Sequence, residues 1–300
     1  MRYSVGLDTS RPISQIIDRV QELADDGFDS VNCSQIFGPD ALTLLAVVGS
    51  HVPRIGLCTA VVPTYPRHPI TLAAQALTVQ AATDGRLSLG IGLSHEFVIE
   101  HLFGMSFEKP ARHMEEYLSV LLPLLHDKTV SYTGETISSA MTLELDAPAP
   151  EVLVAALGPK MLSLAGRLTD GTVTWMTGPS TLESYIIPTI NAAADEAGRP
   201  KPAIAAGFPI CVTDDPDAAR DQIAITYAAY ATLPSYKAML DKEGTTSPAG
   251  AAIVGDEVSV VEQISHLQQI GVTDFRASLT GSPDEIRRTM AVLRHLVTNR

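Results

Sequence analysis

Short apolar segments alternate with longer amphipathic segments along the whole chain. The apolar segments are bounded by Gly or Asp and have the length of β-strands, whereas the longer ones repeat apolar residues with the 3.6-residue period of an α-helix. The segments predicted as strands are 3–7, 30–32, 55–61, 86–92, 151–156, 172–175, 203–212 and 273–279. Strands that alternate with helices pair in parallel, so we predict an α/β protein.

Eight strands with interleaved helices fit a closed (β/α)8 TIM barrel, which usually takes about 250 residues. The chain has 300 residues, so we expect a single domain over 1–300 with insertions in the rim loops. A hairpin is predicted around 132–135. The longest insertion is expected between 223 and 254, where the Gly/Thr/Ser/Pro-rich stretch indicates either a mobile lid or a plain disordered connection. An open doubly wound sheet is disfavoured because no G-x-G-x-x-G motif follows the first strand.

The charge of the chain argues against several classes of partner. The formal net charge is −13, and no cluster of Lys and Arg offsets it, so nucleic acid is not an expected partner. No run of about 18 apolar residues suggests a membrane span. The N-terminal segment also lacks the apolar core and cleavage site of a signal peptide. We therefore expect a cytoplasmic protein with no membrane partner.

The cysteines indicate no metal centre. Cys33, Cys58 and Cys211 are odd in number and far apart, and they form neither a C-x-x-C pair nor a zinc-like spacing. We interpret them as reduced thiols, mostly buried, and we predict no metal site.

In a TIM barrel the reacting groups lie on the loops that follow the strands. The informative strand ends are 59–69, 90–96, 155–165 and 175–179. His95 and Glu96 are candidates for a general acid/base pair, although an exposed polar loop has the same composition. Trp175 is either a core residue or a flat apolar wall for a ring system.

The end of the fifth predicted strand has the parts of an anion site. Gly158 permits a close backbone approach, and Pro159 begins a helix whose free N–H groups and dipole point at the rim. A tight strand-to-helix turn explains the same residues without a ligand. Lys160 adds a contact to a phosphate if it points inward, and is solvated otherwise. Gly90 and Gly92 similarly allow another segment to pack closely against the fourth strand.

These strand ends resemble the luciferase-like monooxygenase superfamily, and most closely its members that use the deazaflavin coenzyme F420. The resemblance runs along nearly the whole chain, and its most specific pieces are 65–69, 85–92, 156–165 and 170–171. It implies a tricyclic ring held across the barrel mouth, with the cofactor phosphate near the fifth strand end and hydride transfer to or from a small organic substrate. It also implies a homodimer.

The resemblance assigns roles to residues of this sequence. It implies a backbone bulge, often with a non-prolyl cis peptide, that supports the ring at the end of the third strand. The candidate cofactor-binding residues are Thr59, Ala60, Val61, Arg67, Ser94, Ala156, Leu157, Gly158, Pro159, Thr177 and Gly178. The candidate catalytic residues are His95, Glu96 and Gln35. His95 lies near the position at which some relatives place an acid.

The sequence departs from the family in two places. At the end of the second strand, where relatives often have His, this chain has the segment from Asn32 to Gln35 and no His. The Gln35 side-chain amide can orient a substrate but hardly titrates. After the sixth strand, Gly178 and Pro179 follow Thr177, so the Lys with which some relatives bind a sugar phosphate is absent. A phosphorylated sugar is therefore a poor candidate substrate.

The residues leave three functions open. The favoured one is hydride transfer between F420 and a small organic substrate, because 65–69 and 158–161 resemble that branch most. The second is an FMN-dependent monooxygenase, in which reduced flavin activates dioxygen. The third is a non-catalytic barrel that binds a flavin or deazaflavin, since a fold does not determine a function. The cofactor decides between the first two chemistries.

Overall fold

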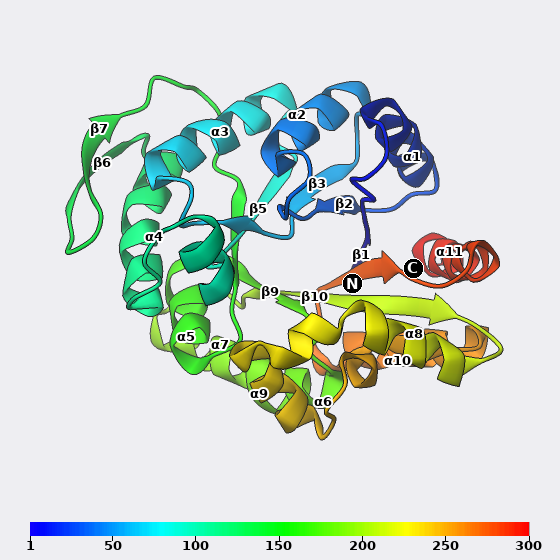
Figure 1. Cartoon of the computed structure of the whole chain (residues 1–300). Coiled ribbons are helices and arrows are strands. Elements are labelled where there is room, and N and C mark those ends of the chain that lie inside the picture. Colours follow the sequence, from blue (N-terminus) through cyan, green and yellow to red (C-terminus); the bar gives the residue numbers. More distant parts are fainter. Residues whose placement is uncertain (300) are drawn as a thin grey trace.

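The computed structural model describes residues 1–299 and forms a closed parallel barrel (Figure 1). Its strands are β1 (Arg2–Gly6), β2 (Ser30–Cys33), β3 (Gly56–Thr59), β5 (Leu87–Gly92), β8 (Glu151–Ala155), β9 (Gly171–Trp175), β10 (Ala203–Val212) and β12 (Asp274–Leu279). Each strand pairs in parallel with the next, and β12 pairs with β1 to close the sheet. The predicted (β/α)8 barrel is confirmed, and the open doubly wound alternative is wrong.

Helices surround the barrel and return the chain from one strand to the next. They are α1 (Ile13–Asp25), α2 (Ala41–His51), α3 (Pro69–Ala82), α4 (Pro110–His126), α5 (Pro159–Leu168), α7 (Ile187–Glu196), α10 (Glu257–Ile270) and α11 (Pro283–Thr298). Proline occupies the first turn of α3, α4, α5, α7 and α11, where its missing N–H has no partner to lose. The prolines in the sequence thus determine several helix starts.

The two faces of the strands bury separate clusters of apolar side chains. Residues such as Val31, Leu89 and Phe275 face the helices and form the main core. The barrel interior holds a smaller apolar cluster, in which Leu153, Val173 and Ala205 lie on β8, β9 and β10. Because side chains alternate along a strand, the neighbours of core residues point into this interior.

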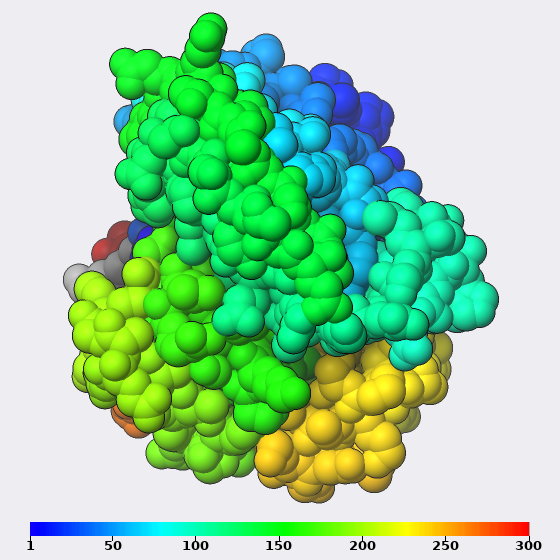
Figure 2. Space-filling view, turned by 90° about the vertical axis from the view of Figure 1, so that its left-hand side faces the viewer, coloured from blue at the N-terminus to red at the C-terminus, as the bar shows by residue number. Residues whose placement is uncertain are grey.

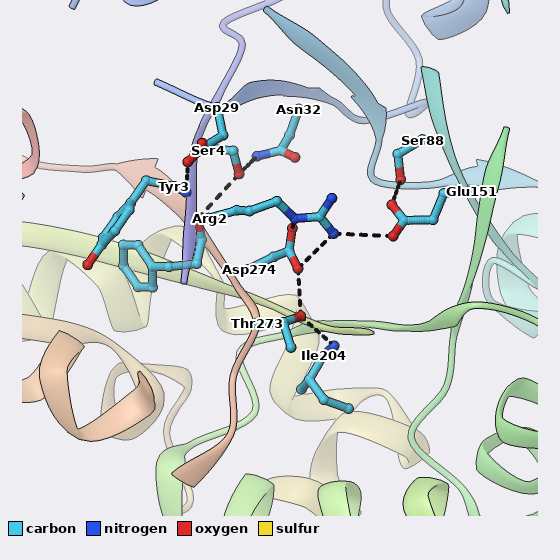
Figure 3. Close-up of polar contacts among 11 residues, drawn as sticks. Arg2, Tyr3, Ser4, Asp29, Asn32, Ser88, Glu151, Ile204, Thr273 and Asp274 are labelled. Carbon is cyan, nitrogen blue, oxygen red and sulfur yellow. Dashed lines mark hydrogen bonds and ion pairs between the residues drawn. The ribbon is translucent and has the colours of Figure 1, made fainter. Parts of the chain in front are cut away.

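An ion-pair network closes the amino-terminal end of the barrel (Figure 3). The Arg2 guanidinium on β1 contacts Asp274 on β12 at 2.5 Å and reaches Glu151 on β8 at 3.2 Å. Ser88 on β5 donates a hydrogen bond to Glu151 at 2.7 Å. Strands from opposite sides of the barrel are therefore linked at this end.

The third strand is interrupted by a bulge that the sequence pattern did not predict. The expected strand 55–61 ends at Thr59, the Ala60–Val61 peptide is cis, and a short strand β4 (Val62–Pro63) follows. A Cβ on Gly90 would lie 2.3 Å from the Thr59 carbonyl oxygen, and one on Gly92 would lie 2.8 Å from the Val61 side chain. The two glycines of β5 therefore leave the space that the bulge fills.

The predicted hairpin is present, and it projects away from the barrel (Figure 1). It consists of β6 (Thr129–Thr133) and β7 (Ser138–Thr142). The buried Glu116 carboxylate on α4 accepts backbone hydrogen bonds from Glu135, Thr136 and Ile137 at 2.7–2.9 Å. Burial raises the pKa of this carboxyl, but these hydrogen bonds and that of the Thr136 hydroxyl outweigh burial and hold the pKa at about 2.

The insertion predicted between 223 and 254 is largely helical rather than a loop. It contains the end of α8 (Pro216–Thr226), then η3 (Ala228–Thr232), α9 (Pro234–Glu243), η4 (Pro248–Ala251) and most of β11 (Ile253–Gly255). The expected loop is limited to 244–247. Pro234 begins α9, and Gly244 ends it at a φ of 79°, which favours glycine.

Glu116→Gln is expected to lower the free energy of unfolding at pH 7 by about 2–3 kcal/mol, because hydrogen bonds to a charged acceptor are worth about 1.5–3 kcal/mol. The stabilisation by the ionised carboxylate is present above the ordinary pKa of 4.5 and is lost as the pH falls from there towards 2. The difference between parent and variant should therefore shrink over this range in urea denaturation. Glu115→Gln, an exposed neighbour on α4, is the control. An equal effect of both variants would contradict the role of Glu116.

Candidate active site

The predicted site residues meet at one end of the barrel. Thr59, Ser94, Gly158 and Thr177 lie at or just after the carboxyl ends of β3, β5, β8 and β9. These strands are parallel and adjacent, so their ends share one mouth. The expected arrangement of these four residues is confirmed.

The amino-terminal end of α5 is open at this mouth. Gly158 precedes the helix, no side chain caps its first turn, and a Cβ built on Gly158 would have no atom within 4 Å. Ala156 is buried, whereas Leu157 is half-buried and Pro159 and Lys160 are exposed. Free N–H groups beside empty space are the arrangement that a phosphate group requires.

The next helix start is closed by the protein itself. The Glu243 carboxylate at the end of α9 accepts hydrogen bonds from the Ser180 and Thr181 backbone N–H groups, at 3.2 and 2.8 Å, in α6 (Pro179–Thr181). The Thr181 hydroxyl also donates to Glu243 at 2.7 Å. A Cβ at position 178 would lie 2.1 Å from the Glu243 carboxyl carbon, so a larger residue would displace this carboxylate from the helix start. Thr177 is fully buried, and its hydroxyl has no partner among residues 1–299.

The bulge presents a partly accessible surface to the barrel mouth. Ala60 and Val61 are half-buried, and Val61 packs against the interior cluster of Leu153, Val173 and Ala205. The Ser34 hydroxyl donates to the Ala60 carbonyl oxygen at 2.8 Å, and Thr59 donates to the Gly90 carbonyl oxygen at 2.7 Å. The bulge is thus fixed from both neighbouring strands.

His95 lies where the segment after β5 meets the inserted α9. Its ring contacts Tyr236 and Tyr230 edge-on, at centroid distances of 5.9 and 6.4 Å. Figure 2 shows the teal segment after β5 beside the golden insertion on one face of the molecule. Burial lowers the pKa of the His95 imidazole below 6.5, so the ring is neutral at pH 7. The neighbouring Glu96 is exposed.

Aromatic side chains continue from His95 to the end of β9. Tyr236 packs on Tyr230, Tyr230 packs on Tyr227, and Tyr227 packs on Trp175, with centroid distances between 4.9 and 6.1 Å. Trp175 lies over Gly207 of β10, where a Cβ would be 2.9 Å from its ring. The insertion therefore spans the mouth between the ends of β5 and β9.

Two predicted site residues have structural contacts instead of facing an open space. The Gln35 side-chain oxygen accepts a hydrogen bond from the Ala41 N–H at 2.7 Å, at the start of α2. Arg67 forms an ion pair with Asp40, and its carbonyl oxygen accepts a hydrogen bond from the Tyr117 hydroxyl at 2.8 Å. These contacts connect the loops after β2 and β4 around the start of α2.

Sequence reasoning missed Glu243 and Arg276. Glu243 is 62 residues from Thr181, and nothing in the local pattern at either position indicates their contact. Arg276 lies in the middle of a buried strand, and a charged residue inside an apolar strand was a signal that could have been used.

The described chain shows neither a metal cluster nor a membrane-spanning helix. No group of three or more His, Cys, Asp and Glu within residues 1–299 could hold a metal ion. In the same residues, no helix has both the length and the apolar character needed to cross a bilayer. The three cysteines are buried free thiols, as predicted, and burial raises the pKa of Cys33 and Cys211 to about 11.

The family of luciferase-like monooxygenases matches residues 1–299. The chain belongs to this family. A relative from Mycobacterium tuberculosis, named as a coenzyme F420-dependent oxidoreductase, is 27% identical, over 96% of this chain and 90% of the relative. The 5,10-methylenetetrahydromethanopterin reductase of Methanolobus tindarius is 26% identical, over 96% and 89%. The coenzyme F420-dependent tetrahydromethanopterin reductase of Methanopyrus kandleri shares this luciferase-like fold at a TM-score of 0.82 and 20% identity, over 98% and 97%.

Glu243→Gln in this family member is expected to loosen the contact between α9 and α6. Because the amide is a weaker acceptor than the carboxylate, amide hydrogen exchange of Ser180 and Thr181 should accelerate, and the free energy of unfolding should fall by about 1–3 kcal/mol. Asp241→Asn, on the exposed side of α9, is the matched control. Unchanged exchange at Ser180 and Thr181 would show that Glu243 does not hold the insertion in place.

Proposed function

We propose that this protein is an F420-dependent oxidoreductase that transfers hydride between the deazaflavin and a small organic substrate. The observation that carries the proposal is the open start of α5 at Gly158, which offers free N–H groups beside unfilled space at the barrel mouth. The relatives named as F420-dependent enzymes support the choice of cofactor. When bound, the deazaflavin supplies a ring carbon that accepts or donates hydride.

The residues at the mouth suit the parts of such a cofactor. The N–H groups at the start of α5 would bind the phosphate, with Ala156 and Leu157 beside it. The ring would lie against the bulge at Ala60 and Val61, whose apolar surface continues into the barrel. The buried Thr177 hydroxyl, which has no partner within residues 1–299, is available to a ring or substrate oxygen.

His95 is the proposed acid/base residue. Its imidazole is kept neutral by burial and so can accept a proton from a substrate hydroxyl when hydride leaves the adjacent carbon. Glu96 is exposed and would reach only a polar group at the outer rim. Substrates without a phosphate suit the site, since Glu243 places a carboxylate at the start of α6.

Several finer expectations remain predictions. They are the single domain over residues 1–300, the homodimer, the cytoplasmic location, and the absence of nucleic-acid and membrane partners. FMN in place of F420, with monooxygenase chemistry, is an outcome of the binding experiment below. A barrel that binds the cofactor without catalysis would bind F420 in that experiment but would transfer no hydride to any substrate.

Gly158→Val is expected to raise the dissociation constant of F420 at least tenfold, about 1.4 kcal/mol, because the added side chain occupies the space beside the α5 N–H groups. Titration of purified protein with F420 and with FMN, followed by ring fluorescence, measures this effect. Lys160→Ala should weaken binding in a salt-dependent way only if its side chain reaches the phosphate. Circular dichroism shows whether each variant is folded. A folded Gly158→Val protein that binds both cofactors as the parent does would disprove the phosphate assignment.

The imidazole of His95 is expected to titrate below pH 6.5. The neutral ring is favoured in the folded protein, so protonation on acidification should oppose folding, and the base should be available at neutral pH. The measurement is an NMR titration of the imidazole C–H signals, with His95→Asn to assign the resonance. A midpoint at or above 6.5 would contradict the environment described for His95.

A further inference from the structure

Arg276 is a buried cation inside the barrel. It lies in β12, next to Phe275, which faces the helices and stacks on Phe208. Side chains alternate along a strand, so Arg276 points into the interior, on the same side as Asp274 at the barrel end. Only 5% of Arg276 is exposed.

No group within residues 1–299 pairs directly with this guanidinium. The Arg276 side chain forms no ion pair or hydrogen bond with the rest of the described chain, and its Nη1 atom is enclosed without a partner. Arg2, by contrast, is paired with Asp274 and Glu151 at the end of the same interior. A buried guanidinium without a direct partner is costly, so its presence points to a ligand that supplies one.

A second unpaired polar atom lies two strands away from Arg276. The Asn32 Nδ2 atom donates to the Ser4 hydroxyl at 2.8 Å (Figure 3), and Ser4 in turn donates to the Phe275 carbonyl oxygen at 3.3 Å. Because the Ser4 proton is used, Ser4 must accept from Asn32. This fixes the Asn32 amide with Oδ1 free, and Oδ1 is buried without a partner in the described residues.

The two unpaired atoms flank the same strand. Ser4 of β1 is in register with Arg276 of β12, and Gly6 of β1 is in register with Asn32 of β2. Neighbouring strands are about 4.8 Å apart, and Ser4 and Gly6 are about 7 Å apart along β1, so the Arg276 and Asn32 backbones are roughly 12 Å apart with β1 between them. The opposite side of the interior is apolar, with Leu153 on β8 and Val173 on β9.

We propose that Arg276 and Asn32 bind the polar edge of a ligand whose ring lies against the apolar side of the interior. Arg276 donates to an oxygen or an anionic atom of that edge, and Asn32 accepts from an adjacent N–H. A cyclic amide or imide has both groups, as the pyrimidine edge of a deazaflavin or flavin does. A substrate amide or carboxylate offers related chemistry. The assignment of this edge to the cofactor rests on the proposed function.

The pairing also predicts which state of the cofactor binds more tightly. A reduced ring gains electron density at its pyrimidine edge, and a guanidinium beside that edge stabilises negative charge. Arg276 should therefore favour the reduced, anionic form over the oxidised form.

The test compares Arg276→Met and Arg276→Lys with the parent chain. In R276M the affinity for reduced F420 should fall at least tenfold more than the affinity for oxidised F420, and R276K should retain part of the preference. The ratio does not depend on the folded fraction, because both forms bind the same folded molecules. Ligand-free R276M should melt at the same temperature as the parent or higher, since it removes a buried guanidinium that has no direct partner. Arg167→Met, on the outside of α5, is the control.

A different result is expected if the polar edge that Arg276 binds belongs to a substrate and not to the cofactor. R276M would then leave both cofactor affinities unchanged and abolish binding of acetate to the cofactor-loaded protein, measured through the fluorescence of Trp175, the one tryptophan. If the parent binds neither F420 nor FMN, the proposed function fails, and acetate binding together with the melting temperature still tests Arg276. Unchanged affinities for F420, FMN and acetate in R276M would overturn the proposal.

Discussion

The close contact between the third-strand bulge and the glycine side of β5 determines the shape of the barrel mouth at which the proposed cofactor ring would lie. Gly90 and Gly92 have no side chains, so the Thr59–Val61 backbone moves towards β5 and occupies that space. The Thr59 hydroxyl then bonds to the Gly90 carbonyl oxygen and fixes the bulge. Any larger residue at position 90 would meet backbone rather than a movable side chain. The two glycines, which in the sequence indicated only close packing against the fourth strand, thus allow the apolar surface at Val61 to form.

Charge is distributed unequally around the mouth. The start of α5 is open, whereas the start of α6 already binds the Glu243 carboxylate. Of these two helix starts, only that of α5 leaves its N–H groups free for an anion, and an anion at α6 would face repulsion from Glu243. Inside the barrel, by contrast, the Arg276 guanidinium is a positive group with no direct partner within residues 1–299. The expected ligands are therefore a cofactor with one phosphate at α5 and a negative ring edge, and a substrate without a phosphate.

The sequence was sufficient to predict the barrel and much of its rim. Periodicity identified each barrel strand, and prolines located helix starts such as Pro69 and Pro159, because both signals are local. The insertion was located by its Gly, Thr and Ser content, but its helices could not be predicted locally, because Met239 and Leu240 become buried only against the barrel. The Glu243 contact joins positions far apart in sequence and could not be seen locally. The bulge was expected only from the family resemblance, since an apolar run such as 55–61 reads as one strand.

The insertion is attached to the rim at two points that belong to one helix. Tyr236 in the first turn of α9 packs on His95, and Glu243 at its end binds the start of α6. The helix has ten residues, so the two contacts are about 10 Å apart along its axis and cannot move independently. A substrate that displaces Tyr236 from His95 must therefore also strain the Glu243 contacts. Contacts at the end of β9 thus influence how readily His95, the proposed acid/base residue after β5, becomes accessible.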